Sequence, residues 1–366
     1  MTKPLALQEW LATRAPYAYR KYQGPTENYA RQAHQALTQQ WQSQQLACEH
    51  IVWHVTNRCN LACLHCGVRG GELAYEEVSL VDFARQMPAL LRLGLRQITL
   101  SGGEPLVRKD IALIIELLKY SGLQVAMVTN GHYLERFASV VRQLDSISIS
   151  IDGLATAHNA LRVHQNSYDH TLKALRFARD MGVPIRNVNT CVTPDNLSDL
   201  PALAQAIVEA GANHWILRPV AVAGRAEAQM RPELEGVYEL LCTAYDLLES
   251  GIPVTVAGLG YLANWDGVFA DTPYVNRTGW NSFYLLPNGD IKGFNAEELP
   301  VEGNLLRDDL PTLWQQGFGM YRQPDLPEAC LKCDFLGQCH GGNLAEAASG
   351  YRCVRPLFSR FQSNKC

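Results

Sequence analysis

The sequence predicts an α/β fold in which a parallel sheet forms most of the chain and a small Cys-rich domain follows it. Two observations carry this prediction. Short apolar runs alternate with helical patterns from residue 51 onward, which is typical of repeated βα units and a parallel sheet. Beyond residue 250 the alternation stops, and cysteines gather between residues 330 and 366.

The predicted strands are the runs IVWHVT, QITL, QVAMVTN, SISISID, PIRNVNTCVT and HWILRPV. Helical patterns lie near residues 79–93, 109–121, 133–143, 168–181, 197–210 and 232–249. Six strands are too few to close an eight-stranded barrel. We therefore expect a partial (β/α)6 TIM-like barrel, with functional groups at the carboxyl ends of its strands.

Three segments divide the chain at this stage. Residues 1–47 contain the run YARQAHQALTQQWQSQQLA, which predicts a helical N-terminal lead-in. Residues 48–250 form the barrel, and residues 251–366 form the smaller domain. Within the latter, FYLLPNGDIKGF predicts two short strands around a turn, because Pro-Asn-Gly-Asp is a hairpin signal.

Composition excludes several classes of protein. The chain has 366 residues, of which 47% are hydrophobic, and its net charge of −4 gives no general attraction to nucleic acid or to an anionic membrane. No apolar run reaches the length of about 18 residues that a membrane span needs, and the N-terminus does not read as a signal peptide. We expect a cytoplasmic protein.

Eleven cysteines without a secretion signal argue against a disulfide framework, because a reducing cytosol keeps thiols free for metals or catalysis. Seven of them form two groups, which predict two metal centres. The first group is Cys59, Cys63 and Cys66; the second is Cys330, Cys333, Cys339 and Cys353.

The first group has C-x3-C-x2-C spacing on a loop directly after the first strand. Three thiolates on a cubane cluster leave one iron free for an outside ligand. The motif resembles the signature of the radical S-adenosylmethionine superfamily. That resemblance implies a 4Fe-4S cluster whose free iron binds S-adenosyl-L-methionine, which is reductively cleaved to a 5′-deoxyadenosyl radical. A structural zinc site, with His65 as fourth ligand, and three buried thiols remain the alternatives.

Further motifs follow successive strands in the order that this superfamily has them: SGGEP, TNG, SIDG and then HNALR. Taken alone, the two glycines of SGGEP indicate no more than a tight turn, although small residues also permit close approach to a ligand. The resemblance implies that a Gly-Gly-Glu segment holds the methionine amino group, and that a Ser and an Arg contact the ribose or carboxylate. The cofactor-binding residues expected from it are Gly102, Gly103, Glu104, Ser150 and Arg162.

The second group has C-x2-C-x5-C-x13-C spacing, and four thiolates can saturate a cubane. It resembles the auxiliary-cluster extension of radical enzymes called SPASM, or its shorter twitch form. A zinc knob is the alternative. The fuller extension has a further Cys soon after the hairpin, where this chain has Gly293 and Phe294. We therefore expect two 4Fe-4S clusters in total, one that binds the cofactor and one auxiliary.

Residues that choose the reaction are harder to find. Strand alternation puts Cys191 on the same face as Asn187 and Asn189, where it is a candidate hydrogen donor to a substrate radical, although a buried Cys is more often plain packing. After the last barrel strand, Arg218 and Arg225 offer guanidinium groups for a substrate carboxylate or phosphate, or lie solvated at the surface.

The leading functional hypothesis is an oxidoreductase-like enzyme of natural product biosynthesis that oxidises or crosslinks a ribosomal peptide. It draws electrons from an external donor such as flavodoxin or ferredoxin. The alternatives are dehydrogenation or epimerisation of a sugar or aminocyclitol, and modification of a tetrapyrrole of the haem pathway. A non-catalytic Fe–S or Zn scaffold is the reading from another class, and an intact Cys triad beside Gly103-Glu104 argues against it.

Overall fold

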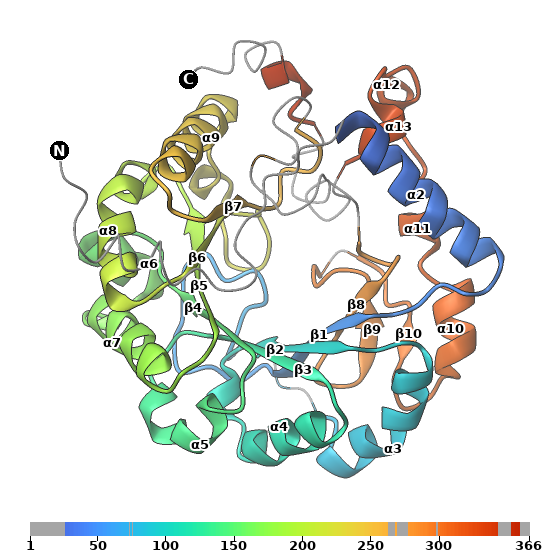
Figure 1. Cartoon of the computed structure of the whole chain (residues 1–366), viewed down its shortest axis with the longest axis horizontal. Helices are drawn as coiled ribbons and strands as arrows, with labels where there is room; N and C mark the ends of the chain where they lie inside the picture. The colour runs from blue at the N-terminus through green and yellow to red at the C-terminus, as the bar shows by residue number, and fades with distance from the viewer. Residues whose placement is uncertain are drawn as a thin grey trace.

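The computed structural model describes residues 26–72, 74, 76–262, 268, 277–297, 299–342 and 353–358. Its described strands form one ten-stranded sheet in the order β10-β9-β8-β1-β2-β3-β4-β5-β6-β7. Strands β1 to β7 are parallel and adjacent in sequence order, and the sheet curves around the centre of the molecule with helices α3 to α9 outside it (Figure 1). The fold is a mixed α/β partial barrel, which confirms the predicted fold class.

Because strands β1 to β7 run parallel, their carboxyl ends lie together at one mouth of the barrel. The strands are β1 (His50–Thr56), β2 (Gln97–Gly102), β3 (Gln124–Thr129), β4 (Ser146–Ser150), β5 (Ile185–Val192), β6 (His214–Pro219), β7 (Val254–Val256), β8 (Ser282–Leu285), β9 (Asp290–Lys292) and β10 (Gly303–Asn304).

The helices that cover the barrel agree with the predicted ranges to within a few residues, apart from α5, whose predicted range is divided between it and a preceding short 3-10 helix at Leu134–Phe137. They are α3 (Leu80–Arg92), α4 (Ile111–Tyr120), α5 (Ala138–Val141), α7 (Ser167–Asp180), α8 (Leu200–Ala210) and α9 (Leu234–Glu249). Helix α6 (Ala155–Arg162) was not predicted, although it carries Arg162 at its end.

The barrel strands turn an apolar face toward the helices, and most of them carry polar side chains on the inner face. On β1, Trp53 is fully buried and stacks on Phe83 of α3 with ring centroids 4.0 Å apart. The opposite face turns polar side chains inward, and these pair with one another across the sheet. His214 lies 3.0 Å from Asn187 and 2.9 Å from Thr255. The core that stabilises the fold therefore lies between sheet and helices, while the barrel interior stays polar.

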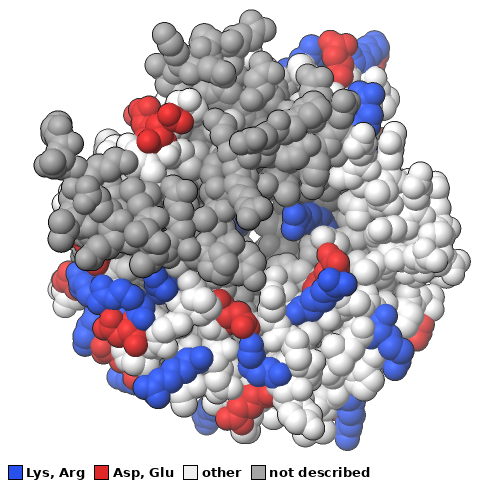
Figure 2. All heavy atoms as spheres, viewed as in Figure 1, with Lys and Arg blue, Asp and Glu red and all other residues white. Residues whose placement is uncertain are grey.

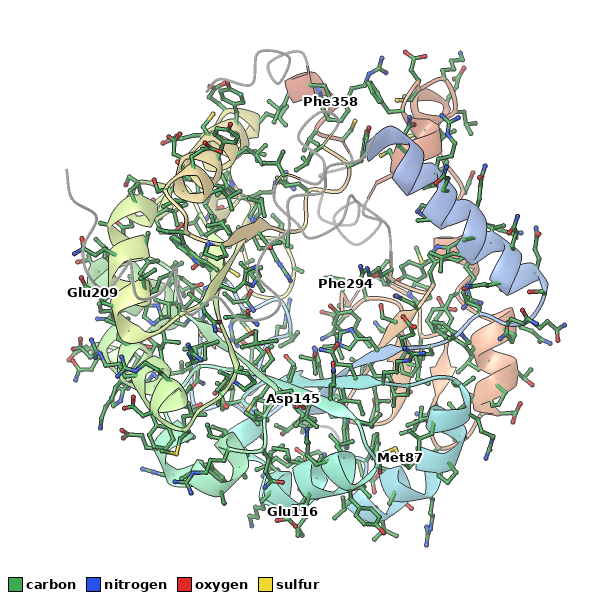
Figure 3. The ribbon with its side chains drawn as sticks, in the orientation of Figure 1. Met87, Glu116, Asp145, Glu209, Phe294 and Phe358 are labelled. Atoms are coloured by element: carbon green, nitrogen blue, oxygen red, sulfur yellow. The ribbon has the colours of Figure 1, made fainter. Side chains whose placement is uncertain are left out.

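The sheet continues from the barrel into the C-terminal part of the chain. β8 and β9 form the predicted antiparallel hairpin, and β8 also pairs in parallel with β1. The hairpin thus extends the barrel sheet instead of standing apart from it. Figure 3 shows Phe294, which follows β9, toward the centre of the molecule, whereas Glu116 and Glu209 project outward from helices α4 and α8.

The N-terminal helix α2 (Thr26–Gln42) packs against the C-terminal helices, which are α10 (Leu310–Gln316), α11 (Gly319–Arg322), α12 (Glu328–Leu331) and α13 (Leu336–Cys339). The Trp41 indole donates to the Gln315 carbonyl over 2.8 Å, and the His34 ring stacks on His340 at 3.5 Å. The predicted lead-in is helical over α2; its residues 1–25 lie outside the described residues. None of the described helices combines the length and the apolar character that crossing a membrane requires.

Candidate functional site

A cavity of 140 Å³ lies at the barrel mouth, where the strands end. The three clustered thiols line one part of it. The remainder comes from the ends of three strands and from four further residues. These lining residues are Ser101, Gly102 and Gly103 at the end of β2, Val128, Thr129 and Asn130 at β3, Ser150 of β4, and Leu61, His65, Arg162 and Arg225.

The thiol-bearing loop after β1 is held on both sides. At its start, the Thr56 hydroxyl accepts the Arg58 N–H over 3.0 Å and donates to the Glu77 carboxylate over 2.5 Å. From a distant part of the chain, Arg225 donates to the carbonyl oxygen of Cys63 over 2.8 Å. Arg225 also pairs with Glu72. Its Nε and Nη1 are therefore engaged in fixing the loop, and binding of substrate by Arg225 stays a prediction.

The three thiols lie close enough to influence one another. The pKa of Cys59 is raised to about 11, mainly by burial and also by the neighbouring Glu104, Cys63 and Cys66. Thiols that resist ionisation while they crowd together are stabilised as thiolates by a bound metal ion or cluster. The donor set of this cavity, with three sulfurs and no fourth thiol, fits a cluster that keeps one iron open.

The two glycines after β2 are required by packing of the backbone. A Cβ on Gly103 would lie 2.2 Å from the Arg58 carbonyl oxygen, and one on Gly102 would lie 2.2 Å from that of Thr56. Gly102 also has a φ of +124°, which L side chains rarely adopt. The glycines therefore let the end of β2 pack directly against the thiol loop.

Glu104 does not line the cavity. Its buried carboxylate accepts hydrogen bonds from the Thr129 hydroxyl and the Asn130 N–H, each over 2.8 Å, and from the Leu106 N–H over 3.2 Å. Burial raises its pKa to about 6. Glu104 thus ties the turn after β2 to the end of β3, and any contact with a cofactor stays a prediction.

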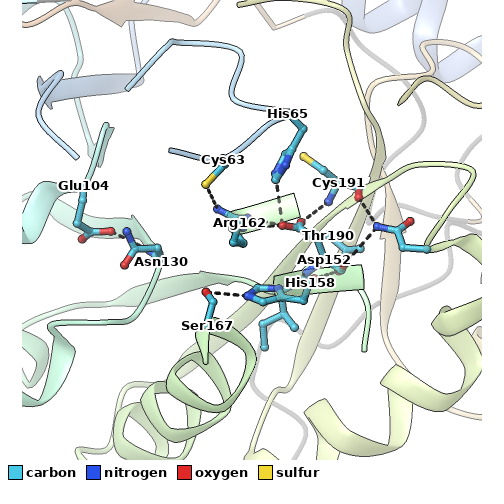
Figure 4. A network of polar contacts seen from close by, with 12 residues as sticks. Cys63, His65, Glu104, Asn130, Asp152, His158, Arg162, Ser167, Thr190 and Cys191 are labelled. Atoms are coloured by element: carbon cyan, nitrogen blue, oxygen red, sulfur yellow. Dashed lines mark hydrogen bonds and ion pairs between the residues drawn. The ribbon is translucent and has the colours of Figure 1, made fainter. Parts of the chain in front are cut away.

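A buried ion network joins the thiol loop to strands β4 and β5 (Figure 4). Arg162 donates to the Asp152 carboxylate through Nε at 2.7 Å, with Nη2 2.6 Å away, and its Nη1 lies 3.7 Å from Cys63 Sγ. His65 Nε2 lies 3.3 Å from the same carboxylate. Asp152 also accepts the backbone N–H of Cys191 over 2.9 Å. Asp152 is the centre of this network, with no exposed side-chain surface.

Electrostatics follow from this arrangement. Burial alone would raise the pKa of Asp152, but Arg162 and His65 hold it well below its usual range. Burial alone would lower the pKa of His65, but the Asp152 carboxylate and hydrogen bonds to Asp152 and Cys191 raise it to about 10. The sequence analysis did not predict this role for Asp152, although it lies inside the quoted SIDG run. His65 entered it only as a possible zinc ligand.

Cys191 is placed on the inner face of β5, as alternation predicts. The register pairs it with Arg218 on β6 and pairs Asn189 with Ser150 on β4. Cys191 Sγ does not line the 140 Å³ cavity, but His65, its hydrogen-bonding neighbour, does. A hydrogen-donor role for Cys191 stays a prediction.

The four C-terminal thiols also gather. Burial raises the pKa of Cys339 to about 11, and Cys353, Cys333 and Cys330 contribute to the increase. Cys330 and Cys333 are joined by a 3.0 Å backbone hydrogen bond, and Cys353 is exposed. Four neighbouring thiols are a donor set that a saturated four-iron cluster or a zinc ion would use.

Comparison with known proteins decides the family. The sequence profile of the Radical SAM superfamily matches residues 53–207, which contain the thiol triad and the ends of strands β1 to β5. Residues 53–207 of this chain belong to the radical SAM superfamily. The chain is a radical SAM enzyme, and its cofactors include S-adenosylmethionine and a 4Fe-4S cluster.

Two curated relatives align with most of the chain. An AdoMet-dependent heme synthase from Nitratidesulfovibrio vulgaris is 26% identical over 331 residues, or 80% of this chain and 87% of the relative. The mycofactocin maturase MftC from Mycolicibacterium smegmatis is 27% identical over 309 residues, or 81% of this chain and 78% of the relative. The match to an Fe-coproporphyrin III synthase from Methanosarcina barkeri, at 26% identity, spans 56% of this chain but only 54% of that relative.

Among solved structures, Streptococcus suis SuiB bound to the precursor peptide SuiA superposes with a TM-score of 0.69. The superposition covers 87% of this chain and 77% of SuiB, at 16% sequence identity. At that identity the likeness supports the shared fold, including its extension beyond the barrel.

Proposed function

We propose that this radical SAM enzyme oxidatively modifies or crosslinks a ribosomally made peptide, with a cofactor-binding cluster on Cys59, Cys63 and Cys66 and one auxiliary cluster on the four C-terminal thiols. The observation that carries the proposal is the 140 Å³ cavity in which three thiols face the polar ends of neighbouring strands. A scaffold that only bound iron or zinc would have no use for such a cavity.

The cluster, when bound with S-adenosylmethionine, supplies the electron that splits the sulfonium into methionine and a 5′-deoxyadenosyl radical. The residues of this chain bind and orient the cofactor. Gly102 and Gly103 bring the backbone of the β2 end to the cavity, while Ser150 and Arg162 offer a hydroxyl and a guanidinium. Glu104 supports this wall from behind through Thr129 and Asn130.

The C-terminal thiols define the rest of the proposal. Their four sulfurs saturate a four-iron cluster, which then has no open iron for substrate and is suited to electron transfer. The net reaction is loss of two hydrogen atoms from the substrate: one is abstracted, and the other leaves as a proton and an electron. An external flavodoxin or ferredoxin supplies the reducing electron for each cleavage.

The peptide class is supported by relatives. MftC, a mycofactocin maturase, aligns with 81% of this chain, and SuiB has been solved with a precursor peptide.

Anaerobic reconstitution followed by reduction tests the reaction class, because the wild-type enzyme should then form 5′-deoxyadenosine. Co-expression with short open reading frames from the neighbouring genes tests the substrate, since a modified peptide should be lighter by two hydrogen atoms. An unchanged mass for each candidate peptide, with cleavage intact, would reject the peptide class.

A tetrapyrrole of the haem pathway is the second candidate. The alignment with an AdoMet-dependent heme synthase covers 80% of this chain and 87% of that relative, which favours it. Incubating the reconstituted enzyme with iron coproporphyrin III and following its absorption and mass distinguishes the two candidates. Loss of carboxyl groups or of hydrogen from the porphyrin would favour this second function.

A further inference from the structure

Arg218 is a charged residue on the inner face of a barrel strand. It lies near the carboxyl end of β6, where Trp215 and Leu217 point outward into the core beneath the helices. Alternation therefore puts Arg218 on the inner face, together with His214, whose ring pairs with Asn187 and Thr255 inside the barrel. The register also sets Arg218 beside Cys191 of β5. Arg218 therefore lies on the inner face of the barrel, beside Cys191, the candidate hydrogen donor.

Within the described residues, Arg218 makes no hydrogen bond and no ion pair, and its side chain is exposed. The other two guanidinium groups of the site differ in this respect. Arg162 is held by Asp152, and Arg225 is held by Glu72 and two backbone carbonyls. A free arginine on an outer helix is simply solvated, but one on an inner strand face is available to whatever enters the barrel.

The guanidinium of Arg218 is a positive charge without an ion-pair partner among the described residues. Tyr284 of β8 is half-buried, and burial raises its pKa while the charge of Arg218 lowers it. Tyr284 pairs with Val52 of β1, on the same face as His54, so its ring also lies inside the barrel. Figure 2 shows basic side-chain atoms beside a hollow at the centre of this face.

The acidic side chains of the site are already engaged. Asp152 is shared by Arg162 and His65, and Glu104 accepts three hydrogen bonds. Aromatic rings contribute apolar surface near Tyr284: its ring centroid lies 5.8 Å from that of His54 and 5.1 Å from that of Phe294. An exposed guanidinium beside apolar surface suits a carboxylate on a molecule that also presents apolar surface.

We propose that Arg218 binds a carboxylate of the substrate inside the barrel and so fixes which carbon lies beside the cofactor cavity and Cys191. The inference rests on the proposed function, because it states what the substrate must present. Two sources share this chemistry: an Asp or Glu side chain of a peptide, and the propionate of a tetrapyrrole. The planar guanidinium binds either in a bidentate manner, which a lysine does not reproduce.

The test uses the reconstituted enzyme with S-adenosylmethionine and four forms of the protein: wild type, Arg218→Gln, Arg218→Lys and Arg92→Gln. Arg92 is the matched control, since it lies exposed in the last turn of α3 on the outside of the barrel. Arg218 makes no described hydrogen bond, so its variants are expected to fold. Iron content and circular dichroism check this directly.

Two probes separate the sources of the carboxylate. The first is a random peptide library displayed on mRNA, sequenced after selection on each protein. The second is iron coproporphyrin III, titrated by its Soret band and compared with its tetramethyl ester. In one of these arms we expect the wild type and Arg92→Gln to select Asp or Glu at one position, or to bind the free acid better than the ester.

Arg218→Gln should lose about ten- to hundredfold in affinity in that same arm, and Arg218→Lys should lose less. Binding of the ester to Arg218→Gln should be no weaker than binding of the ester to the wild type or of the free acid to Arg218→Gln. This is expected when both changes remove the same contact. Equal binding by wild type and Arg218→Gln in the responding arm would overturn the proposal. So would the absence of any preference for an acid in both arms.

Failure of the proposed function is visible separately. Formation of 5′-deoxyadenosine by the same wild-type preparation reports the radical chemistry, whereas both binding arms proceed without reduction. A preparation that binds acids through Arg218 but forms no 5′-deoxyadenosine would reject the proposed function and keep the carboxylate site.

Discussion

The thiols of the barrel mouth contact side chains from distant parts of the chain, whereas the backbone hydrogen bonds that the structure describes around the C-terminal thiols join residues close in sequence. Arg225 reaches the carbonyl of Cys63 from 162 residues away, and Arg162 approaches the Cys63 sulfur from 99 residues away. Around Cys333, by contrast, backbone bonds join it to Cys330 and to Leu336. The four-residue helix α13 packs against α2, where His340 stacks on His34.

This difference fits the proposed roles, in which the first group of thiols positions a cofactor and the second holds an auxiliary cluster. A site that must align a cofactor with a substrate needs a rigid surrounding, because small displacements cost large factors in rate. A site that only passes electrons tolerates a looser frame. Removing metal from each group should therefore have different structural consequences, and variants of each group should separate cofactor cleavage from product formation.

The largest effect is expected from replacing Cys59, Cys63 and Cys66 together with Ala. Because these thiols are proposed to hold the only cluster with an open iron, formation of 5′-deoxyadenosine should fall to background. Iron per protein should drop from about eight atoms to about four, as one of two four-iron clusters is lost. A wild-type iron content near four or near twelve would contradict the model of a single auxiliary cluster.

Cys333→Ala is the complementary change and should lose a similar share of iron while keeping cleavage of S-adenosylmethionine. The barrel mouth does not depend on the C-terminal thiols for its hydrogen bonds, so the cofactor cavity should remain intact. Product formation should stop, because the electron released from the substrate then has no acceptor. Limited proteolysis should show new cleavage near α12 and α13 only. Normal product yield without the auxiliary cluster would contradict the proposed electron-transfer role.

Asp152→Asn should have the next largest effect, on stability. It leaves the buried Arg162 and His65 without their shared carboxylate, which costs about 3–5 kcal/mol when one partner of a buried pair is removed. Urea unfolding of the reconstituted protein measures this. Asp180→Asn is the control: its exposed pair with Arg179 should be worth about 1 kcal/mol or less. Equal losses for the two variants would mean that the buried network does not stabilise the fold.

The pH dependence of the same comparison has a definite sign. The pKa of Asp152 is depressed below its ordinary 3.8, so its contribution is present above that pH and is lost as the pH falls below it. The pKa of His65 is raised to about 10, so its contribution is complete below 6.5 and is lost as the pH rises toward 10. The stability difference between wild type and Asp152→Asn should therefore be largest near neutral pH and smaller at both extremes.

Several of these features were predictable from sequence because they are local. Alternating apolar residues predicted the strands, and the spacing of Cys59, Cys63 and Cys66 predicted the site that the family match covers. Helix α6 was not predicted because it has only eight residues, of which His158 and Leu161 are buried, and so short a helix gives no periodic signal. The Asp152 network escaped for another reason: it joins residues on three elements, and no local pattern in one sequence records such contacts.

Other features depend on tertiary structure and add to the reasons given for a motif. The glycines of SGGEP line the cavity, and a Cβ at either position would also strike the backbone of residues 56 and 58. The Glu104 carboxylate accepts hydrogen bonds from Thr129, Asn130 and Leu106, and its contact with the cofactor stays a prediction. The pairing of β8 with β1, which continues the barrel sheet past residue 250, joins strands far apart in sequence.

The smallest effect distinguishes a residue that touches the cofactor from one that only builds the wall. Ser150 lines the cavity, and its hydroxyl has no hydrogen-bond partner within the described part of the chain. Ser148, two residues earlier on the same inner face of β4, accepts a hydrogen bond from Asn187 over 3.1 Å and does not line the cavity. The two serines thus form a matched pair on one strand.

Ser150→Ala should weaken binding of S-adenosylmethionine about three- to tenfold, the value of one neutral hydrogen bond, without loss of iron. Ser148→Ala should leave the dissociation constant unchanged within error, because its hydroxyl serves the barrel interior. Equilibrium dialysis of the reconstituted, unreduced variants gives both constants. If both variants weaken binding equally, the effect comes from the strand and not from contact with the cofactor. If neither does, Ser150 does not bind the ribose or the carboxylate, and the contact must come from Arg162 or from the backbone at Gly102 and Gly103.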